Sequence, residues 1–263
     1  MTTSADDLAP LLARMDAQVV ELRDRRDDRR IFLAVYATMT GAIQRALADG
    51  RFMDPRWTTE LTTRFAALYF DAEEAWRLGG RCPGPWEAAF AAGGRRRIST
   101  FEHALLGINA HIVYDLPFAV AATMQEVGDV VDGRLEAAVL VRRRHDYEVV
   151  NQVLAETIVA AQAVLAQESR VTRWLDVAAM RLDEYAAELL LRVSRTQGWH
   201  AALALAVARD DAECEAVRRH LDRVACSYVE RIDLGRMVPT AAGRRLMRRV
   251  RPPLIELIRP DGS

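Results

Sequence analysis

The chain has 263 residues, of which 51% are hydrophobic, and its formal net charge is −1. This length allows one large domain or two small ones with a sizeable core, and the apolar content excludes a disordered protein. The near-zero net charge gives no overall field that would attract nucleic acid, so we expect no nucleic-acid partner.

Apolar residues recur at helical spacing along most of the chain, and no alternating strand pattern of useful length occurs. Helices are expected over about 4–22, 31–48, 58–77, 135–167, 172–195 (extending or restarting to about 208) and 210–232. A central helix begins at Ser99 and should be kinked or broken near Asp115, because Pro117 lies inside the apolar run. The glycine- and proline-rich segment 79–97 is predicted to be a loop with a short helix, anchored by Trp86 and Phe90.

These elements predict an all-α fold, a single-domain bundle of about eight helices. Within it we expect an N-terminal helix over residues 1–30, a helical core domain over 31–232 and a basic C-terminal tail over 233–263.

Cysteine usage and the N-terminus bear on the compartment. The three cysteines lack the spacing of a metal-binding CxxC pair, and an odd number without a secretory signal indicates free thiols. No uncharged apolar run reaches the roughly 18 residues that cross a bilayer. The sequence therefore predicts a cytoplasmic protein with no membrane span.

Three polar residues, Asn109, His111 and Asp115, stand in the apolar segment ahead of Pro117. Polar groups are costly to bury without partners, so these residues are candidates for a functional site. His111 and Asp115 lie one helical turn apart on one face, where they could bind a metal or act as an imidazole oriented by a carboxylate. Asn109 lies about 120° away from both, which favours a contact with a neighbouring helix. His103 lies about 12 Å from His111 along the axis, too far to share an ion on a straight helix.

A second group of polar residues is His145-Asp146, followed by Asn151. The adjacent His-Asp weakly resembles the pattern of HD phosphohydrolases, in which a distant histidine and aspartate complete a metal site. His111 and either Asp176 or Asp183 could fill those places. The alternative is an exposed face, because three arginines precede His145.

A third group pairs Arg195 with Trp199, four residues apart. A guanidinium held against an indole could grip an anionic substrate. An exposed helix face with salt bridges is the alternative that we favour for this stripe.

The segment Phe101 to Pro117, together with Asp146-Tyr-x-x-Val-Asn151 and Arg195-x-x-x-Trp199, resembles a bacterial family of helical proteins of unknown function. The hallmark of that family is H-x-L-L-G-x-N-A-H-I-x-x-D-L-P, and the resemblance covers roughly residues 31–208. The usual Arg-Glu-x-x-Trp of the family appears here without its acid. The resemblance implies a location for the site and no particular reaction.

Our leading hypothesis is an enzyme with a buried polar site that hydrolyses an ester or phosphoester with a divalent metal, zinc or a harder ion. The assigned residues are His111, Asp115, Asp146 and Asn151 for catalysis, His111, Asp115, Asp146 and Asp183 for the metal, and His103, Asn109, Arg195 and Trp199 for the substrate.

Two alternatives stay open. One is a metal-independent tailoring enzyme that uses His111 as general acid or base on a small metabolite, and the other is a non-catalytic helical protein that binds a small ligand. The chain has no GxSxG, P-loop, GxGxxG or HExxH motif, so no nucleotide cofactor is predicted. The sequence leaves the oligomeric state open.

Overall fold

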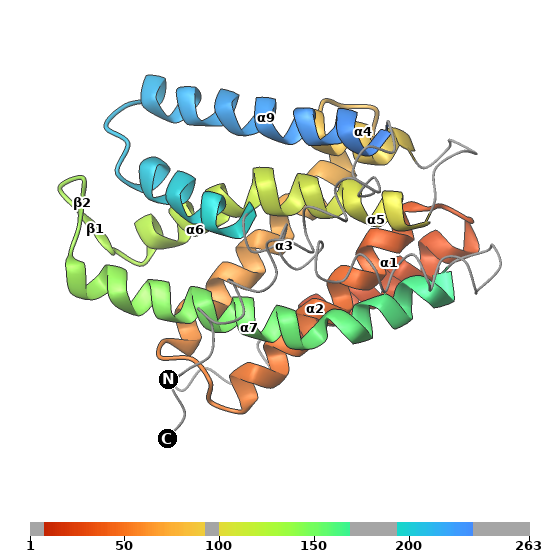
Figure 1. Cartoon of the computed structure of the whole chain (residues 1–263), viewed down its shortest axis with the longest axis horizontal. Coiled ribbons are helices and arrows are strands. Elements are labelled where there is room, and N and C mark those ends of the chain that lie inside the picture. The colour runs from red at the N-terminus through yellow and green to blue at the C-terminus, as the bar shows by residue number, and fades with distance from the viewer. Residues whose placement is uncertain (1–7, 93–99, 169–193, 234–263) are drawn as a thin grey trace, which may run out of the picture.

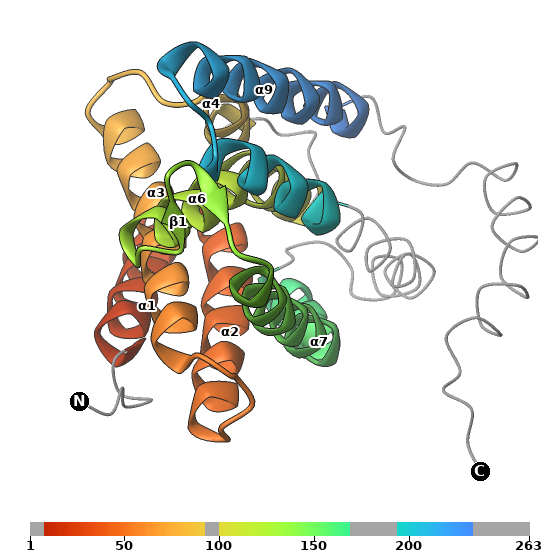
Figure 2. The ribbon, with the colours of Figure 1, turned by 90° about the vertical axis from the view of Figure 1, so that its left-hand side faces the viewer.

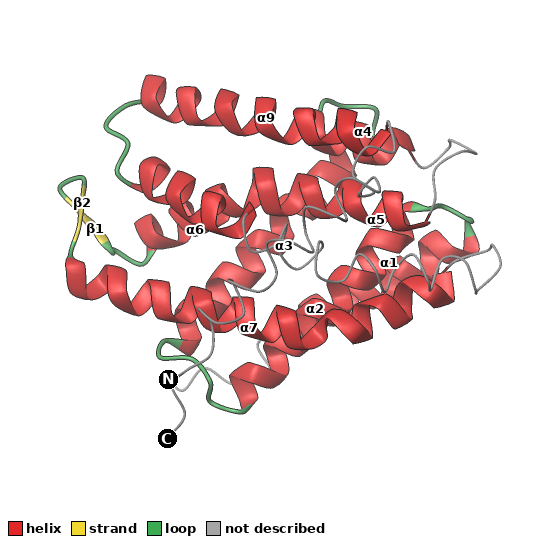
Figure 3. Ribbon diagram, viewed as in Figure 1, coloured by secondary structure: helices red, strands yellow, loops and turns green. Residues whose placement is uncertain are grey.

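The computed structural model describes residues 8–92, 100–168 and 194–233, and these ranges are almost entirely helical (Figures 1 and 3). The helices are α1 (Ala9–Asp24), α2 (Arg29–Ala48), α3 (Pro55–Arg77), α4 (Gly84–Ala91), α5 (Thr100–Asn109), the π-helix η3 (Ala110–Asp115), α6 (Leu116–Glu126), α7 (Ala137–Glu168) and α9 (Asp211–Asp233). Residues 194–206 form a further helical stretch. The all-α prediction is confirmed, with eight α-helices bounded inside the described ranges.

Local signals set several of the helix ends. The Asp54 carboxylate accepts the N–H of Trp57, and Pro55 occupies the first turn, so α3 begins three residues before the predicted start. Gly50 and Gly79 adopt positive φ just after α2 and α3, the conformation that ends a helix with little strain in glycine. The predicted start at Ser99 and most of the predicted helix 172–195 lie outside the described residues.

A small hairpin follows α6. Its strands, β1 (Val130–Val131) and β2 (Arg134–Leu135), pair in antiparallel fashion. Asp132 and Gly133, between them, both have positive φ, as a two-residue type I′ turn requires.

A continuous rod of α5, η3 and α6 runs through the centre of the bundle (Figures 1 and 2). Its parts are contacted by α2, α3, α4, α7 and α9. All six side chains of η3 are buried, and the neighbouring helices supply mostly aromatic and aliphatic contacts. The central rod is therefore the part of the chain whose polar residues are hardest to explain as surface groups.

Gly107 lies where α5 crosses α2. A Cβ atom at Gly107 would lie 2.4 Å from Cγ and 2.7 Å from Cβ of Phe32. Only glycine permits this approach, which brings the Phe32 ring up to the rod at η3.

Three helices are long and apolar enough to cross a membrane by length and composition, namely Arg29–Ala48, Glu102–Glu126 and Ala137–Glu168. The prediction of no membrane span is therefore not supported. The prediction counted only segments without any charged residue, whereas an apolar segment of 18 residues can contain one or two charged residues and still qualify. In the most apolar 18-residue segment of each helix, 61%, 83% and 39% is buried inside the fold, in the same order. Packing between helices therefore covers most of this segment in the first two helices and less of it in the third.

Candidate active site

The π-helix η3 (Ala110–Asp115) places the central polar residues. In a regular α-helix the carbonyl of Val113 would need the N–H of residue 117, which is proline and has none. The Leu116 N–H instead bonds to the carbonyl of His111, five residues back. The break expected near Asp115 thus takes the form of a wider helical turn, after which α6 continues (Figure 1). Such π-turns often occur at functional sites.

His111 and Asp115 form the predicted pair. Nδ1 of His111 lies 3.0 Å from Oδ2 of Asp115, and each residue is only 2% exposed. The indole Nε1–H of Trp86, on α4, donates to the same carboxylate oxygen at 2.8 Å. The carboxylate is therefore fixed by the indole and in turn fixes the imidazole. Trp86 was predicted only as an apolar anchor, and its hydrogen bond to Asp115 is a contact that the sequence did not indicate.

Aromatic rings fix the His111 imidazole from several sides. The Phe65 ring stacks on it with centroids 3.5 Å apart and planes 8° apart, and the Tyr36 ring meets it edge-on at 4.5 Å. Phe32 lies at 5.7 Å. We call Phe32, Tyr36, Phe65 and Trp86 the aromatic box. These residues come from α2, α3 and α4, so packing between helices defines the orientation of His111.

The other imidazole nitrogen, Nε2 of His111, is buried and has no hydrogen-bond partner in the described part of the chain. The buried hydroxyls of Tyr36, Thr40 and Tyr69 share this property. Tyr36 contacts the His111 ring directly, and Tyr69 contacts Tyr36. Two of these hydroxyls therefore belong to rings that pack around His111, while Trp57 and Thr58 carry buried atoms of the same kind elsewhere in the described core.

Burial controls the charge of the pair. It lowers the pKa of His111 well below the usual value, and the positive charge of Arg195 lowers this pKa further. Burial raises the pKa of Asp115 well above its usual value, an effect that the hydrogen bond from Trp86 partly opposes. The imidazole is therefore neutral at neutral pH, which is the form that a general base requires.

A second buried cluster surrounds Arg195, which is 3% exposed. Its Nε–H donates to Oδ1 of Asn151, and its guanidinium lies 4.6 Å from the centroid of the Tyr147 ring. The Tyr147 hydroxyl donates to the carbonyl of Arg195 at 2.6 Å. The Arg195 guanidinium packs on the Tyr147 ring and not, as predicted, on the Trp199 indole, over which Arg144 lies at 5.4 Å. The favoured alternative of an exposed face is also wrong, since Trp199 too is 3% exposed.

The Arg195 cluster and the His111 pair lie on helices that touch. A Cβ atom on Gly198 would lie 3.6 Å from Cδ2 of Leu116 and 3.7 Å from the carbonyl oxygen of Ile112. The stretch 194–206 therefore packs directly on the end of η3. This contact agrees with the effect of the Arg195 charge on the pKa of His111.

Asp146 has a different environment from the one predicted. Its two carboxylate oxygens accept the backbone N–H groups of Met53 and Asp54 at 2.7 and 2.8 Å, and His145 Nδ1 lies 3.2 Å away. No hydrogen bond or ion pair within the described ranges joins it to the His111 pair. Asp146 thus braces the turn before α3 against α7, a structural contact in place of the expected catalytic one.

The other predicted residues are also placed. Asn109 donates from Nδ2 to the carbonyl of Ala225 on α9 at 2.9 Å, which confirms the expected brace to a neighbouring helix. His103 is buried at the far part of α5, with Nε2 3.9 Å from Asp28. Neither contact includes the His111 pair.

A comparison with protein families matches residues 8–232 to a family of unknown function, DUF5995. The chain belongs to the DUF5995 family. The match extends beyond the predicted resemblance over residues 31–208 at both ends. Comparisons of this DUF5995 chain with curated proteins and with solved structures each found no match.

The predicted metal site of the DUF5995 chain is only partly visible. Of its four assigned ligands, His111 and Asp115 lie together, Asp146 braces the turn before α3, and Asp183 lies outside the described residues. The described ranges hold no group of three or more His, Cys, Asp or Glu side chains that could bind a metal ion.

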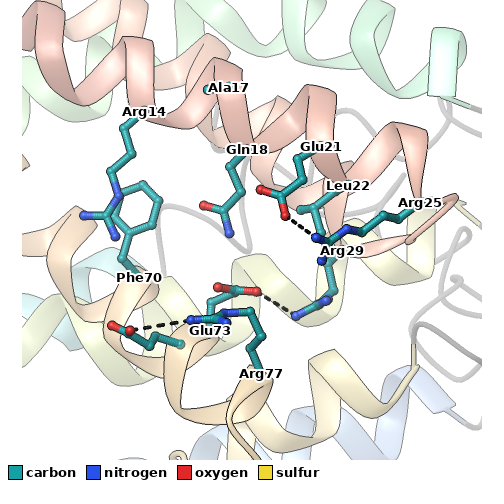
Figure 4. A pocket seen from close by; sticks show the side chains of 11 residues that line it. Arg14, Ala17, Gln18, Glu21, Leu22, Arg25, Arg29, Phe70, Glu73 and Arg77 are labelled. Carbon is teal, nitrogen blue, oxygen red and sulfur yellow. Dashed lines mark hydrogen bonds and ion pairs between the residues drawn. The ribbon is translucent and has the colours of Figure 1, made fainter.

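The DUF5995 chain also has a surface pocket of about 450 Å³ between α1 and α3 (Figure 4). Its charged groups are mainly paired with one another, as in the ion pairs Arg25–Glu21 at 2.8 Å and Arg29–Glu73 at 2.8 Å. The guanidinium of Arg14 lies over a phenylalanine ring. Because these charges already have partners, the pocket gives no clear preference for one ligand chemistry.

Proposed function

We propose that this DUF5995 chain is a metal-independent enzyme that acts on a small, largely apolar molecule, with His111 as general acid and base. The observation that carries this proposal is that Nε2 of His111 has no partner in the described ranges, whereas Nδ1 is fixed by Asp115. Leaving a buried polar atom without a partner costs about 1–3 kcal/mol. A site that fixes the ring through Nδ1 and leaves Nε2 without a described partner is best explained if that partner is a ligand.

Each residue then has a defined task. His111 takes a proton at Nε2 from a bound water or substrate hydroxyl. The positive charge that then forms on the ring favours the ionised form of Asp115, whose Oδ2 accepts the Nδ1–H. The indole N–H of Trp86 keeps Asp115 in the required orientation. The aromatic box restricts the substrate to molecules with an apolar body.

Metal-dependent hydrolysis is a second candidate, because a carboxylate on one nitrogen is also the common neighbour of a metal-binding histidine. His111 would then hold zinc or a harder ion through Nε2, and Asp183 is the predicted ligand that still awaits a test. In both cases the proposed location is the cytoplasm, and cell fractionation tests it against the three apolar helices.

The test uses a series of p-nitrophenyl esters of increasing acyl length, with excess chelator present. The wild type is compared with His111→Gln and with His220→Gln, which changes an exposed histidine on α9. We expect hydrolysis in chelator by the wild type and the control, and loss of hydrolysis in His111→Gln.

Other outcomes would decide between the alternatives. Equal rates in wild type and His111→Gln would contradict the role of His111. Activity that disappears in chelator and returns with zinc would establish the second candidate. Esters that bind without being hydrolysed would indicate a non-catalytic binding protein.

A further inference from the structure

Arg195 is a buried cation whose charge is not balanced within the described part of the chain. Its Nε–H meets the neutral amide oxygen of Asn151, its guanidinium faces the Tyr147 ring, and no described carboxylate lies within ion-pair distance. Burial lowers its pKa, and the charge of Glu148 only partly offsets this effect. Buried charges without a counter-ion are costly, so proteins normally pair them.

The surroundings of Arg195 are built to hold its position. Tyr147 lies below the guanidinium and also donates its hydroxyl to the Arg195 carbonyl at 2.6 Å. Asn151 is oriented by its own hydrogen bond from Nδ2 to Oε2 of Glu148 at 2.8 Å. A guanidinium has five N–H donors in a planar fork, and the hydrogen bond to Asn151 uses the one at Nε.

We propose that Arg195 is the anion-binding group of the His111 site, and that the ligand is a small apolar molecule carrying a carboxylate or phosphate group. This inference rests on the proposed function, because it names the substrate class of that site. The stretch that carries Arg195 packs on the end of η3 through Gly198, and the Arg195 charge acts on His111, so the two groups belong to one buried region. The planar fork matches a carboxylate or phosphate through two parallel hydrogen bonds.

Binding of hexanoate tests this proposal, with hexanol as the neutral control and inorganic phosphate as the free anion, measured by calorimetry on the full chain. We expect hexanoate to bind more tightly than hexanol. Arg195→Met should weaken hexanoate binding by about 10- to 100-fold, since a hydrogen bond to a charged group contributes about 1.5–3 kcal/mol. The affinity for hexanol should not change.

A second variant covers the case in which Arg195→Met fails to fold. Asn151→Asp is nearly isosteric and places a carboxylate on the Arg195 Nε–H, where it would act as an internal counter-ion. Glu148 is partly exposed and also paired with Arg144, so it can move away from the new charge. We expect Asn151→Asp to fold, to melt at or above the wild-type temperature and to lose hexanoate binding.

The outcomes separate this inference from the proposed function. If hexanoate still binds to Asn151→Asp and Arg195→Met, the anion site is overturned. It is also overturned if the wild type does not bind hexanoate while Arg195→Met unfolds, and Arg195 is then a structural residue. His111→Gln should keep hexanoate binding while losing ester hydrolysis. Anion binding that depends on Arg195, with ester hydrolysis unaffected by His111→Gln, would support the anion site and refute the catalytic role. Binding of phosphate but not hexanoate would overturn the apolar part of the proposed ligand.

Discussion

Replacing Gly107 with alanine should destabilise the protein and disturb the aromatic box around His111. The new Cβ would lie 2.4 Å from Cγ and 2.7 Å from Cβ of Phe32. Carbon atoms in contact prefer separations of about 3.5–4.0 Å. The Phe32 Cβ cannot move away by a side-chain rotation, so α5 and α2 must separate. Phe32 contacts both Trp86 and His111, and the strain therefore reaches the candidate site.

The magnitude follows from two opposing terms. Overpacking of a core costs about 1–3 kcal/mol, and three atoms below 3.0 Å place this substitution at the upper end. Alanine regains at most about 1 kcal/mol over glycine inside a helix. The net loss is about 2 kcal/mol, which lowers the melting temperature by about 4–8 °C for a domain of this size.

Gly41→Ala is the matched control, because it makes the same change inside α2 where there is room. The nearest atoms to its Cβ would be Nη1 of Arg45 at 3.6 Å and Cδ2 of Leu12 at 4.0 Å. This variant should gain about 0.5–1 kcal/mol. Calorimetric melting of both variants, with near-ultraviolet circular dichroism to follow Trp86, checks the pair. Shifts of the same sign in both would refute the close crossing of α5 and α2.

Three further predictions concern the buried polar contacts. Trp86→Phe removes the donor to Asp115 and should lower the free energy of unfolding in urea by about 1.5–3 kcal/mol, and a loss below about 0.5 kcal/mol would show that the bond is unimportant. Asp146→Ala removes the acceptor for two backbone N–H groups and should cost about 1–3 kcal/mol for each, whereas ester hydrolysis per folded molecule should be unchanged; a selective loss of hydrolysis would return Asp146 to the active site. The pKa of His111 lies below 6.5 in the folded protein, so the unfolded chain takes up a proton at this residue before the folded protein does. The contribution of neutral His111 to stability is therefore complete above pH 6.5 and is lost as the pH falls toward the folded-state pKa. Between about pH 7.5 and 5.5 the melting temperature of the wild type should fall more than that of His111→Gln.

The parts of the fold that depend on neighbouring residues could be predicted from the sequence. The spacing of apolar residues predicted α2 and α3, and Asp54 with Pro55 held the signal for the true start of α3. The His111–Asp115 pair was predictable for the same reason, because a four-residue separation on a helix brings two side chains together without help from any other element.

Contacts between distant parts of the chain could not be predicted in this way. Trp86 reaches Asp115 across 29 residues, and Asp146 reaches the turn before α3 across 92 and 93 residues. A single sequence shows that a carboxylate is present in an apolar setting, but the packing of the helices decides whether it meets an imidazole or a pair of backbone N–H groups. Asp146 looked like a site residue because both uses require a buried carboxylate.

Two buried polar groups that are energetically unfavourable without a partner lie on or against the central rod. Among the described residues, η3 presents an imidazole nitrogen without a partner, and the stretch packed on its end presents a guanidinium without a counter-ion. Either cost alone could be a tolerated imperfection of packing, since a few buried polar groups remain unpaired in most proteins. The two groups lie on touching elements, and their other atoms are held by Asp115 for His111 and by Tyr147 and Asn151 for Arg195, which argues for one common cause. A ligand with a proton to exchange at Nε2 and a negative charge for Arg195 would relieve both costs at once, and it would do so only in the folded state, so its binding would also stabilise the protein.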